Sequence, residues 1–272
     1  MQVLLNIYRF IFCRKIFYKF NYHLYKLALR GIGILNSEGP KVTGETFLLK
    51  KLKKSFSFKT IIDVGANDGG FAAEIRGYFP NASIYAVEPH PETFKRLSKV
   101  AKEKKIFAFN IGLGNHTEKG YLWDFADNAN LKSSQPTSTL ASGIKDVIEE
   151  LHKQKAKAYE FKMDTLDNFA KKEKIKKIDF LKIDIEGNEL SVLEGAKNLI
   201  KGNKISLIEF EFNEMNAYSR TFFKDFINLL PNFKFYRIMP KGLYKLGPYK
   251  PITHEIFAFQ NILAVKKGLR NI

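Results

Sequence analysis

The sequence predicts an α/β fold with a mostly parallel sheet and helices on both of its faces, and two observations lead to this prediction. Apolar runs of strand length alternate with helical stretches beyond residue 59, as βαβ units require. The chain of 272 residues, 45% of them hydrophobic, is also long enough for one sizeable core. The expected strands are 60–64, 84–87, 106–111, 178–185 and 205–212. The expected helices are 70–78, 91–101, 189–199 and 219–230.

Two stretches depart from this alternation. An insertion at about 121–160 is polar and rich in Ser and Thr, and its last part places Ile144, Val147, Ile148 and Leu151 on one helical face. A lid or an acceptor-binding element would have this composition, and so would a plain surface excursion. Near the C-terminus, segments 233–238 and 255–265 flank a turn with Pro and Gly, so we expect an antiparallel hairpin at the sheet edge.

Residues 1–44 differ in composition from the remainder, and we expect a basic helical segment with a connector ahead of one domain at 45–272. The formal net charge is +17, and residues 1–60 contain twelve Lys or Arg but only two acidic residues. The apolar run at 1–13 is interrupted by Arg9 and is shorter than the roughly 20 residues of a spanning helix. Because no small-residue cleavage site follows it, we expect neither a transmembrane helix nor a secretory signal.

An amphipathic basic helix is expected after this run. Steps of three and four residues place Lys15, Lys19, His23, Lys26 and Arg30 on one side, and Phe17, Phe20, Leu24, Leu27 and Ala28 on another. Two interpretations remain open: packing against the core or in a homodimer interface, and peripheral contact with an anionic membrane. The single cysteine, Cys13, excludes an internal disulfide and a cysteine-based zinc site and favours a reducing compartment, so we expect a cytoplasmic protein.

The segment TIIDVGANDGGFAAEI at 60–75 joins a buried strand to a helix through a Gly-rich turn. Gly65 and Gly69 let the backbone turn tightly and approach a ligand, and the free N–H groups of the next helix suit a carboxylate or phosphate. Asn67 or Asp68 can cap that helix. Asp63 would repel a pyrophosphate and attract an amino or sulfonium group. We therefore expect replacement of Gly65 or Asp63 to abolish ligand binding before it harms the fold.

Glu88 ends the second expected strand, where an acidic side chain can accept hydrogen bonds from both hydroxyls of a ribose. An adenosine-containing cofactor is therefore implied. A nicotinamide dinucleotide fits poorly, because the turn has the spacing G-x-x-x-G-G and lacks the G-x-G-x-x-G fingerprint. S-adenosylmethionine carries a carboxylate for the helix end, cationic groups for nearby carboxylates and a ribose for Glu88, so each of its charges finds a partner.

The sequence resembles class I methyltransferases, and more closely the FkbM family. The resemblance runs in order from about Lys59 to Val265, and it rests on IIDVGANDGGFA, IYAVEPHPETFKRL, FNIGLGN, MDTLDNF, DFLKIDIEGNELSVLEGA, LIEFEFNE and HEIFAFQNILAV. It implies a Rossmann-like fold with a mostly parallel seven-stranded sheet, S-adenosylmethionine as the methyl donor, and O-methylation of sugars in surface glycans or of natural products. The basic segment before about Val42 lies outside the resemblance.

The expected cofactor-binding residues lie at the carboxyl ends of the first four strands. Asn110 ends the third strand, where class I enzymes contact adenine, although it could simply cap a turn. The full predicted set is Asp63, Gly65, Asn67, Gly69, Phe71, Glu88, Pro89, Asn110 and Asp184.

Asp184 is the leading candidate for a catalytic residue. Lys182 and Asp184 share one side of the fourth strand, and a central parallel strand is normally apolar on both faces, so such charges should face the crevice. Asp184 could act with Lys182 or His254 as an acid–base group on an acceptor hydroxyl. Alternatively, Asp184, Glu209 and Glu211 could hold a Mg²⁺-type ion, but we favour metal-free catalysis.

These features favour a cytoplasmic S-adenosylmethionine-dependent O-methyltransferase acting on a sugar hydroxyl in a glycan precursor, free or carried on lipid. The main alternative is a nucleic-acid methyltransferase, which the charge of +17 would permit. Against it, DIEG follows the fourth strand where a base-clamping N-P-P-Y motif would stand. A third alternative is a non-catalytic scaffold, against which the acidic strand ends argue.

Overall fold

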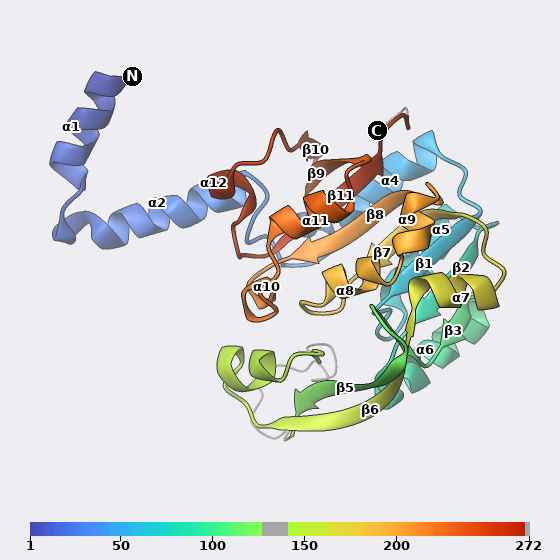
Figure 1. The fold of residues 1–272 in the computed structure, drawn as a ribbon. Helices are drawn as coiled ribbons and strands as arrows, with labels where there is room; N and C mark the ends of the chain where they lie inside the picture. The colour runs from blue at the N-terminus through green and yellow to red at the C-terminus, as the bar shows by residue number, and fades with distance from the viewer. Residues whose placement is uncertain (127–140, 270–272) are drawn as a thin grey trace.

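The computed structural model describes residues 1–126 and 141–269, and its centre is one twisted sheet (Figure 1). Within the described residues this sheet has eight strands in the order β10-β9-β11-β8-β7-β1-β2-β3. Their bounds are β1 Thr60–Val64, β2 Ser83–Val87, β3 Phe107–Phe109, β7 Ile178–Ile183, β8 Ile205–Phe212, β9 Phe233–Met239, β10 Gly242–Lys245 and β11 Gln260–Lys266. Strands β3, β2, β1, β7 and β8 pair in parallel, which confirms the predicted α/β class.

The C-terminal strands pair antiparallel, as predicted, but their placement differs in two respects. Strand β11 pairs with both β8 and β9, so it lies inside the sheet, and β10 forms the edge as an additional strand. The second strand of the pair begins at Gln260, after the short helix α12 (Pro251–His254) and a turn. In that turn, the carboxylate of Glu255 accepts hydrogen bonds from the N–H groups of Phe223 and Lys224.

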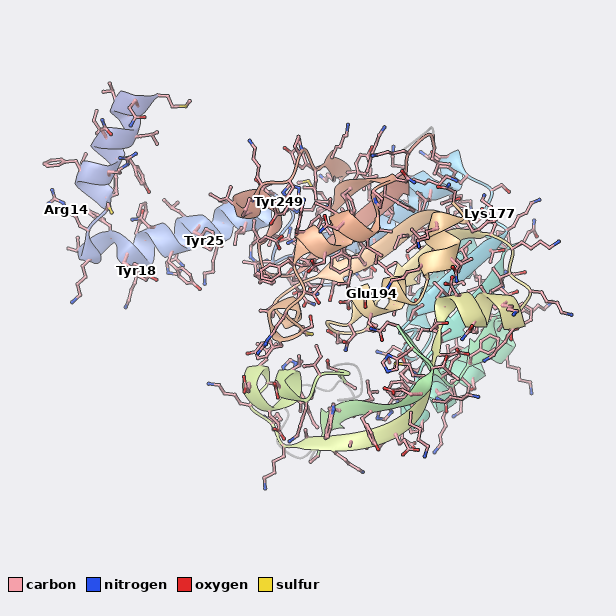
Figure 2. The ribbon with its side chains drawn as sticks, in the orientation of Figure 1. Arg14, Tyr18, Tyr25, Lys177, Glu194 and Tyr249 are labelled. Atoms are coloured by element: carbon pink, nitrogen blue, oxygen red, sulfur yellow. The ribbon has the colours of Figure 1, made fainter. Side chains whose placement is uncertain are left out.

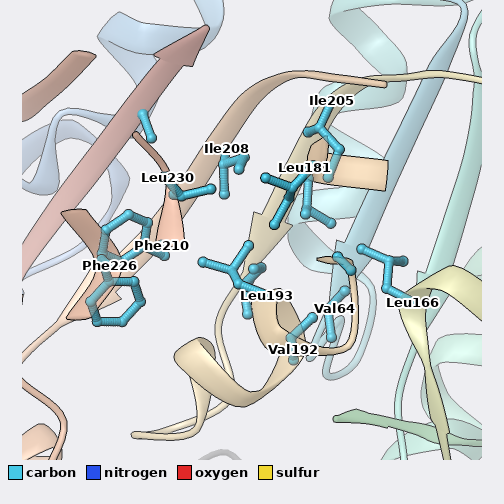
Figure 3. Close-up of a cluster of buried hydrophobic side chains, with 14 of the residues drawn as sticks. Val64, Leu166, Leu181, Val192, Leu193, Ile205, Ile208, Phe210, Phe226 and Leu230 are labelled. Carbon is cyan, nitrogen blue, oxygen red and sulfur yellow. The ribbon is translucent and has the colours of Figure 1, made fainter. Parts of the chain in front are cut away.

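Helices cover both faces of the sheet, and each face has its own core. Helices α4 (Glu45–Ser55), α5 (Gly70–Tyr78) and α6 (Pro91–Lys104) pack on one face around Leu48, Ile75 and Phe180. Helices α7 (Leu166–Lys172), α8 (Glu189–Glu194), α9 (Lys197–Lys201) and α11 (Phe223–Leu229) cover the other face, with α10 (Met215–Tyr218) between β8 and α11. Figure 3 shows the second core, which includes Val64, Leu181 and Leu193 as well as the stacked rings of Phe210 and Phe226.

A second, three-stranded sheet stands apart from the central one in Figure 1. It consists of β4 (Gly112–Gly114), β6 (Ala156–Thr165) and β5 (Glu118–Phe125), in that order. Much of the expected insertion is therefore a β-ribbon, and one helical turn at Val147–Leu151 lies between β5 and β6 in the chain. Residues 127–140 of the expected insertion lie outside the described residues.

The MDTLDNF segment anchors this small sheet to the main domain. Asp164 accepts hydrogen bonds from Thr117 and Asn168 and pairs with Lys172. Although partial burial opposes it, these contacts lower the pKa of Asp164 to about 2. Asp167 accepts hydrogen bonds from the N–H groups of Asn198 and Leu199 at the start of α9. Both carboxylates therefore join elements at the base of the ribbon.

The N-terminal segment forms helices that project from the domain (Figures 1 and 2). Helix α1 is Gln2–Phe12, a short 3₁₀ turn follows at Lys15–Phe17, and α2 is Tyr18–Gly31. A connector with α3 (Pro40–Thr43) leads into α4. The boundaries predicted at 1–44 and 45–272 stay a prediction.

Candidate active site

Three charged residues form a row across neighbouring strands of the central sheet. Asp63 on β1 is in register with Lys182 on β7, which is in register with Glu209 on β8. All three are buried, and they lie on the same face of the sheet as Ile61 and Phe180, which are core residues of the α4 side. A buried row of charges in the middle of a parallel sheet is costly unless its members compensate one another.

Lys182 is the cation that compensates this row. Its Nζ atom donates a hydrogen bond to Asp184 Oδ2 at 2.6 Å and lies 3.8 Å from Glu45 Oε1, on the first turn of α4. The ammonium also lies 4.9 Å from the centroid of the Phe71 ring, which is close enough for a cation–π contact. Lys182 therefore connects the end of β7 with α4 and α5.

The electrostatics of the row follow from burial and from this single cation. Burial alone would lower the pKa of Lys182, but the surrounding carboxylates, Asp184 first among them, raise it well above its usual range. Burial raises the pKa of Asp63 to about 7, although Lys182 opposes that shift. Burial and the charge of Glu45 likewise raise the pKa of Glu209. Near neutral pH, Lys182 is charged while the buried carboxyls share protons among them.

Gly65 and Gly69 both adopt positive φ in the turn after β1, but they serve different contacts. A Cβ atom on Gly65 would lie 1.8 Å from the carbonyl oxygen of Asp184, which is a backbone atom. A Cβ atom on Gly69 would instead meet Leu97 of α6 at 2.9 Å. Gly65 thus lets β1 and β7 end against each other, so its replacement disturbs the fold as well as any ligand site.

Glu88, just beyond β2, is held by backbone groups on both sides. Its Oε2 accepts from the N–H of Asn67 at 3.0 Å, and its Oε1 accepts from the N–H of His90 at 2.8 Å. Burial raises the pKa of Glu88 to about 7. Asn110 donates from Nδ2 to the carbonyl oxygens of Glu88 and Pro89, so its described role is to hold this turn.

A cavity of about 140 Å³ opens where these strand ends meet. Its lining is Gly65, Asn67, Glu88, Pro89, Leu122, Ala141, Asp184, Ile185 and Glu186. A larger cavity of about 400 Å³ shares Gly65, Pro89, Leu122 and Ile185 with it and extends under the small sheet. The two cavities lie at the switch point between β1 and β7, where doubly wound sheets bind their ligands.

The residues of the smaller cavity fit an adenosine-containing ligand with a charged amino-acid end. The Oδ1 atom of Asn67 is buried and has no hydrogen-bond partner among the described residues, so it is free for a ligand donor. Glu88 faces the same cavity with a carboxylate that can accept further hydrogen bonds from a ribose. The backbone of Gly65 is part of the same lining.

The remaining predicted cofactor residues lie behind this lining. Asp63 is buried beneath it. The cation that acts on the Asp63 carboxylate is Lys182 of the same chain. Phe71 lies under the ammonium of Lys182, and Gly69 packs on α6. The structure thus places Gly65, Asn67, Glu88, Pro89 and Asp184 on the cavity surface and the other four predicted residues in supporting positions.

The loop after β7 is held in a strained turn next to the cavity. Glu186 has φ 57° and Gly187 has φ 105°. Glu189 Oε1 accepts from the N–H groups of Gly187 at 3.0 Å and Ile185 at 3.3 Å. The hydroxyl of Ser142, which forms a bridge with Trp123 of β5, donates to the carbonyl oxygen of Glu186 at 2.8 Å. These bonds fix the backbone that carries Asp184.

His254 does not join this cluster. It lies in α12, which Figure 1 shows far from the ends of β1 and β2. His254 is only 2% exposed, its ring packs against Phe223 and Tyr249, and Nδ1 contacts the backbone of Lys250. In this arrangement the ring stabilises the α12 turn and has no access to the cavity.

Two of the three alternative metal ligands have other hydrogen-bond partners. Glu211 accepts a hydrogen bond from Asn213 Nδ2 at 2.7 Å, while Asp184 is paired with Lys182. Across residues 1–126 and 141–269, no group of three His, Cys, Asp or Glu side chains is arranged to hold a metal ion. The position between Asp184 and Glu45 is occupied by the Lys182 ammonium.

Sequence reasoning missed Glu45 as a member of the site. It lies 137 positions before Lys182 and carries no motif, so only the packing of α4 on the sheet brings it there. Its Oε2 is held by the hydroxyl of Thr43 at 3.0 Å. Its position directly after Gly44, at a helix start, was the only available signal.

Curated relatives of this chain are also methyltransferases. Methyltransferase 1 of Beauveria bassiana is 27% identical over 144 residues, which are 50% of this chain and 57% of that protein. Hexuronic acid methyltransferase AglP of Haloferax volcanii is 25% identical over 147 residues, which are 54% of each. The chain thus spans a little over half the length of the curated relatives that it matches.

A solved structure and a family model also match this chain. A precorrin-6y C5,15-methyltransferase from Geobacter metallireducens superposes with a TM-score of 0.41 and 11% identity, over 82% of this chain and 87% of that one. The family model of the methyltransferase FkbM domain matches residues 63–237. Since this match covers well over half of the chain and includes the Gly-rich turn, Glu88 and the Lys182–Asp184 pair, the protein belongs to the FkbM methyltransferase family.

Proposed function

We propose that this protein is a cytoplasmic S-adenosylmethionine-dependent O-methyltransferase that methylates a sugar hydroxyl during synthesis of a surface glycan, such as a lipopolysaccharide, capsule or glycoprotein glycan. One observation carries the proposal: Asp184, with 38% of its side chain exposed, faces the cavity lined by Gly65, Asn67 and Glu88 and is held by buried Lys182. Family membership supports methyl transfer. The relative named for hexuronic acid, a sugar acid, supports a sugar acceptor.

In this proposal the strand ends hold the methyl donor. Glu88 accepts from the ribose, Asn67 Oδ1 accepts a donor of the ligand, and Gly65 allows close approach of the backbone. The class I fold implies S-adenosylmethionine, which supplies an electrophilic methyl group bound to a positively charged sulfur.

Asp184 is the proposed general base. Asp184 would take up the hydroxyl proton of the acceptor, while the bound donor would supply the methyl group and keep the electron pair of its carbon–sulfur bond. Lys182 is a positioning residue, because its hydrogen bond fixes the orientation of the Asp184 carboxylate. This scheme needs no metal ion, and Lys182 supplies the positive charge at the position where a bound ion would otherwise stand between Asp184 and Glu45.

The acceptor is proposed to enter through the larger cavity. Tyr121, Trp123 and Phe161 of the small sheet contribute aromatic surface to it, and Asn115 and Asn188 contribute hydrogen-bonding groups. Apolar rings with a few placed polar groups are a common lining for ligands of this size. An acceptor bound here would approach Asp184 through the shared lining at Gly65 and Ile185.

Isothermal titration with S-adenosylmethionine and with its demethylated product tests the first part of the proposal. Absence of binding to both compounds would overturn it. Mass spectrometry of surface glycans from cells with and without the gene tests the acceptor, and we expect a shift of one methyl group.

The charge of +17 favours nucleic acid as the second candidate acceptor. Methyl transfer to RNA or DNA, with salt-dependent binding and unchanged glycans, would establish that candidate in place of a sugar.

A further inference from the structure

The two helices α1 and α2 expose an unusual amount of apolar surface. Phe10 is 74% exposed and Ile16 is 81% exposed, and α1 has no buried residue. The exposed large apolar residues of this segment are Val3, Leu4, Leu5, Ile7, Tyr8, Phe10, Ile11, Ile16, Tyr18, Phe20, Tyr22, Leu24, Tyr25 and Leu27. We call residues 2–31 the arm. Apolar surface this contiguous marks an interaction site.

The arm has a defined shape of its own. Tyr8 donates from its hydroxyl to Asn21 Oδ1 at 2.7 Å, and Asn21 donates from Nδ2 to the carbonyl oxygen of Phe12 at 2.9 Å. The Phe12 ring packs against the rings of Tyr8, Phe17 and Phe20. These contacts fix the bend between α1 and α2, and Figure 2 shows the bent arm standing clear of the domain with Arg14, Tyr18 and Tyr25 on its surface.

The base of the arm is anchored to the domain. Leu29 and Ile34 are buried, and Arg30 Nη1 donates to Glu38 Oε1 at 2.7 Å. The N–H of Leu35 donates to the carbonyl oxygen of Phe259 at 2.8 Å, next to β11. The arm therefore presents its surface in a fixed relation to the domain.

The charge of the arm indicates which kind of surface binds to it. Residues 1–30 contain six Lys or Arg residues and no Asp or Glu. Two arms packed face to face would bring like charges together, and the whole chain carries a net charge of +17, so a second copy is a poor electrostatic partner. A surface that is anionic and apolar at once satisfies both features, and an anionic lipid bilayer is such a surface.

We propose that the arm binds the surface of an anionic membrane, with α1 and α2 lying in the interface. Helix α1 has 11 residues and α2 has 14, so they span about 16 Å and about 21 Å, less than the roughly 30 Å of the hydrocarbon core. Four tyrosines are among its exposed residues, and tyrosine is enriched at the level of lipid headgroups. Among the described helices, none is long and apolar enough to cross a membrane.

This binding goes beyond the proposed function, because it needs neither the methyl donor nor the cavity. It would hold a methyltransferase beside lipid-linked acceptors, and it would hold a chain without any methyltransferase activity just as well.

Sedimentation of the full chain with lipid vesicles tests the proposal. We expect binding to vesicles of phosphatidylcholine with about one third phosphatidylglycerol, and much weaker binding to phosphatidylcholine alone or at high salt. The triple variant Lys15→Gln, Lys19→Gln, Lys26→Gln should bind on the order of a hundredfold more weakly, at roughly fivefold for each charge. The matched control Lys99→Gln, Lys102→Gln, Lys201→Gln removes three exposed charges outside the arm and should change partitioning little.

The apolar contribution is tested by Leu4→Asp, with Ile252→Asp as its control, because Ile252 of α12 is also exposed and lies outside the arm. Loss of vesicle binding in the first variant alone supports the proposal, and circular dichroism checks that both variants remain folded. Full binding by Leu4→Asp or by the triple variant would overturn it. Absence of vesicle binding together with a dimer that Leu4→Asp dissociates would instead make the arm an interface between two copies.

Discussion

Lys182 Nζ donates a hydrogen bond to Asp184 Oδ2 over 2.6 Å, and through this bond a buried ammonium orients a carboxylate that faces the cavity. The two residues occupy alternate positions at the end of β7 but differ in exposure: Lys182 is buried among carboxyls, whereas Asp184 is partly open. This difference separates their expected roles, because only Asp184 can reach an acceptor.

Asp184→Asn should lower the turnover number by roughly 10²-fold to 10⁴-fold, because an amide of the same shape cannot take up the acceptor proton. The affinity for S-adenosylmethionine should change little. Steady-state kinetics with titration calorimetry separates the two effects. Asp179→Asn at the opposite end of β7 is the matched control, since its carboxylate accepts from the N–H groups of Lys59 and Thr60 and from the ammonium of Lys177. An unchanged turnover number in Asp184→Asn would exclude this residue as the base.

Lys182→Met should destabilise the fold by about 3–5 kcal/mol at neutral pH, because it leaves buried carboxylates without their cation. The loss should be larger at about pH 8 than at about pH 5.5, where Asp63 and Glu209 can be protonated at small cost. Urea unfolding at both pH values measures it. Adding Glu209→Gln should restore part of the stability, since it removes one of the uncompensated charges.

Lys172→Met is the control for this variant. Lys172 also pairs with a buried carboxylate, that of Asp164, but its own side chain is 59% exposed. Solvent screens such a pair, so the loss should be at most about 1 kcal/mol. Equal losses for Lys172→Met and Lys182→Met would show that Lys182 has no special role in the row.

The elements of the fold that local sequence signals mark were predictable. The bounds of β1 (Thr60–Val64), α5 (Gly70–Tyr78) and β8 (Ile205–Phe212) coincide with the apolar runs and Gly-rich turns that mark them. The expected helix at 189–199 divides into α8 and α9 instead. A Cβ atom on Gly195 would lie 2.0 Å from the carbonyl oxygen of Gly114, so the break serves an approach to β4 that no local pattern encodes.

The candidate site was predictable to the extent that its residues lie at strand ends. Asp63, Glu88 and Asp184 follow from the rule that parallel strands deliver side chains to one edge. Glu45 and the hydroxyl of Ser142 come from α4 and from the insertion, and their positions depend on tertiary packing. His254 is the opposite case. Its place in a family motif suggested a role at the site, but its ring packs against Phe223.

Glu88→Gln should weaken binding of S-adenosylmethionine by about 10-fold to 100-fold. A glutamine has one acceptor oxygen, whereas Glu88 accepts from the N–H groups of both Asn67 and His90, so one buried donor would face the amide NH₂. Titration calorimetry measures the loss. Asn110→Ala removes only the bonds to the carbonyl oxygens of Glu88 and Pro89 and should cost less affinity. If it cost more than Glu88→Gln, the ligand would depend on Asn110 directly.

Glu189→Gln should make the protein more stable than the wild type above neutral pH and remove part of its pH dependence. Burial raises the pKa of Glu189 from 4.5 to about 7, so its contribution to stability is fully present below about pH 4.5 and is lost as pH rises through about 7. Glutamine keeps an oxygen for the N–H groups of Gly187 and Ile185 but does not titrate. The difference in unfolding free energy between variant and wild type should therefore increase with pH, by on the order of 3 kcal/mol across that interval. Urea unfolding at several pH values measures this difference, and a constant difference would show that Glu189 ionises in the folded protein as it does in the unfolded chain.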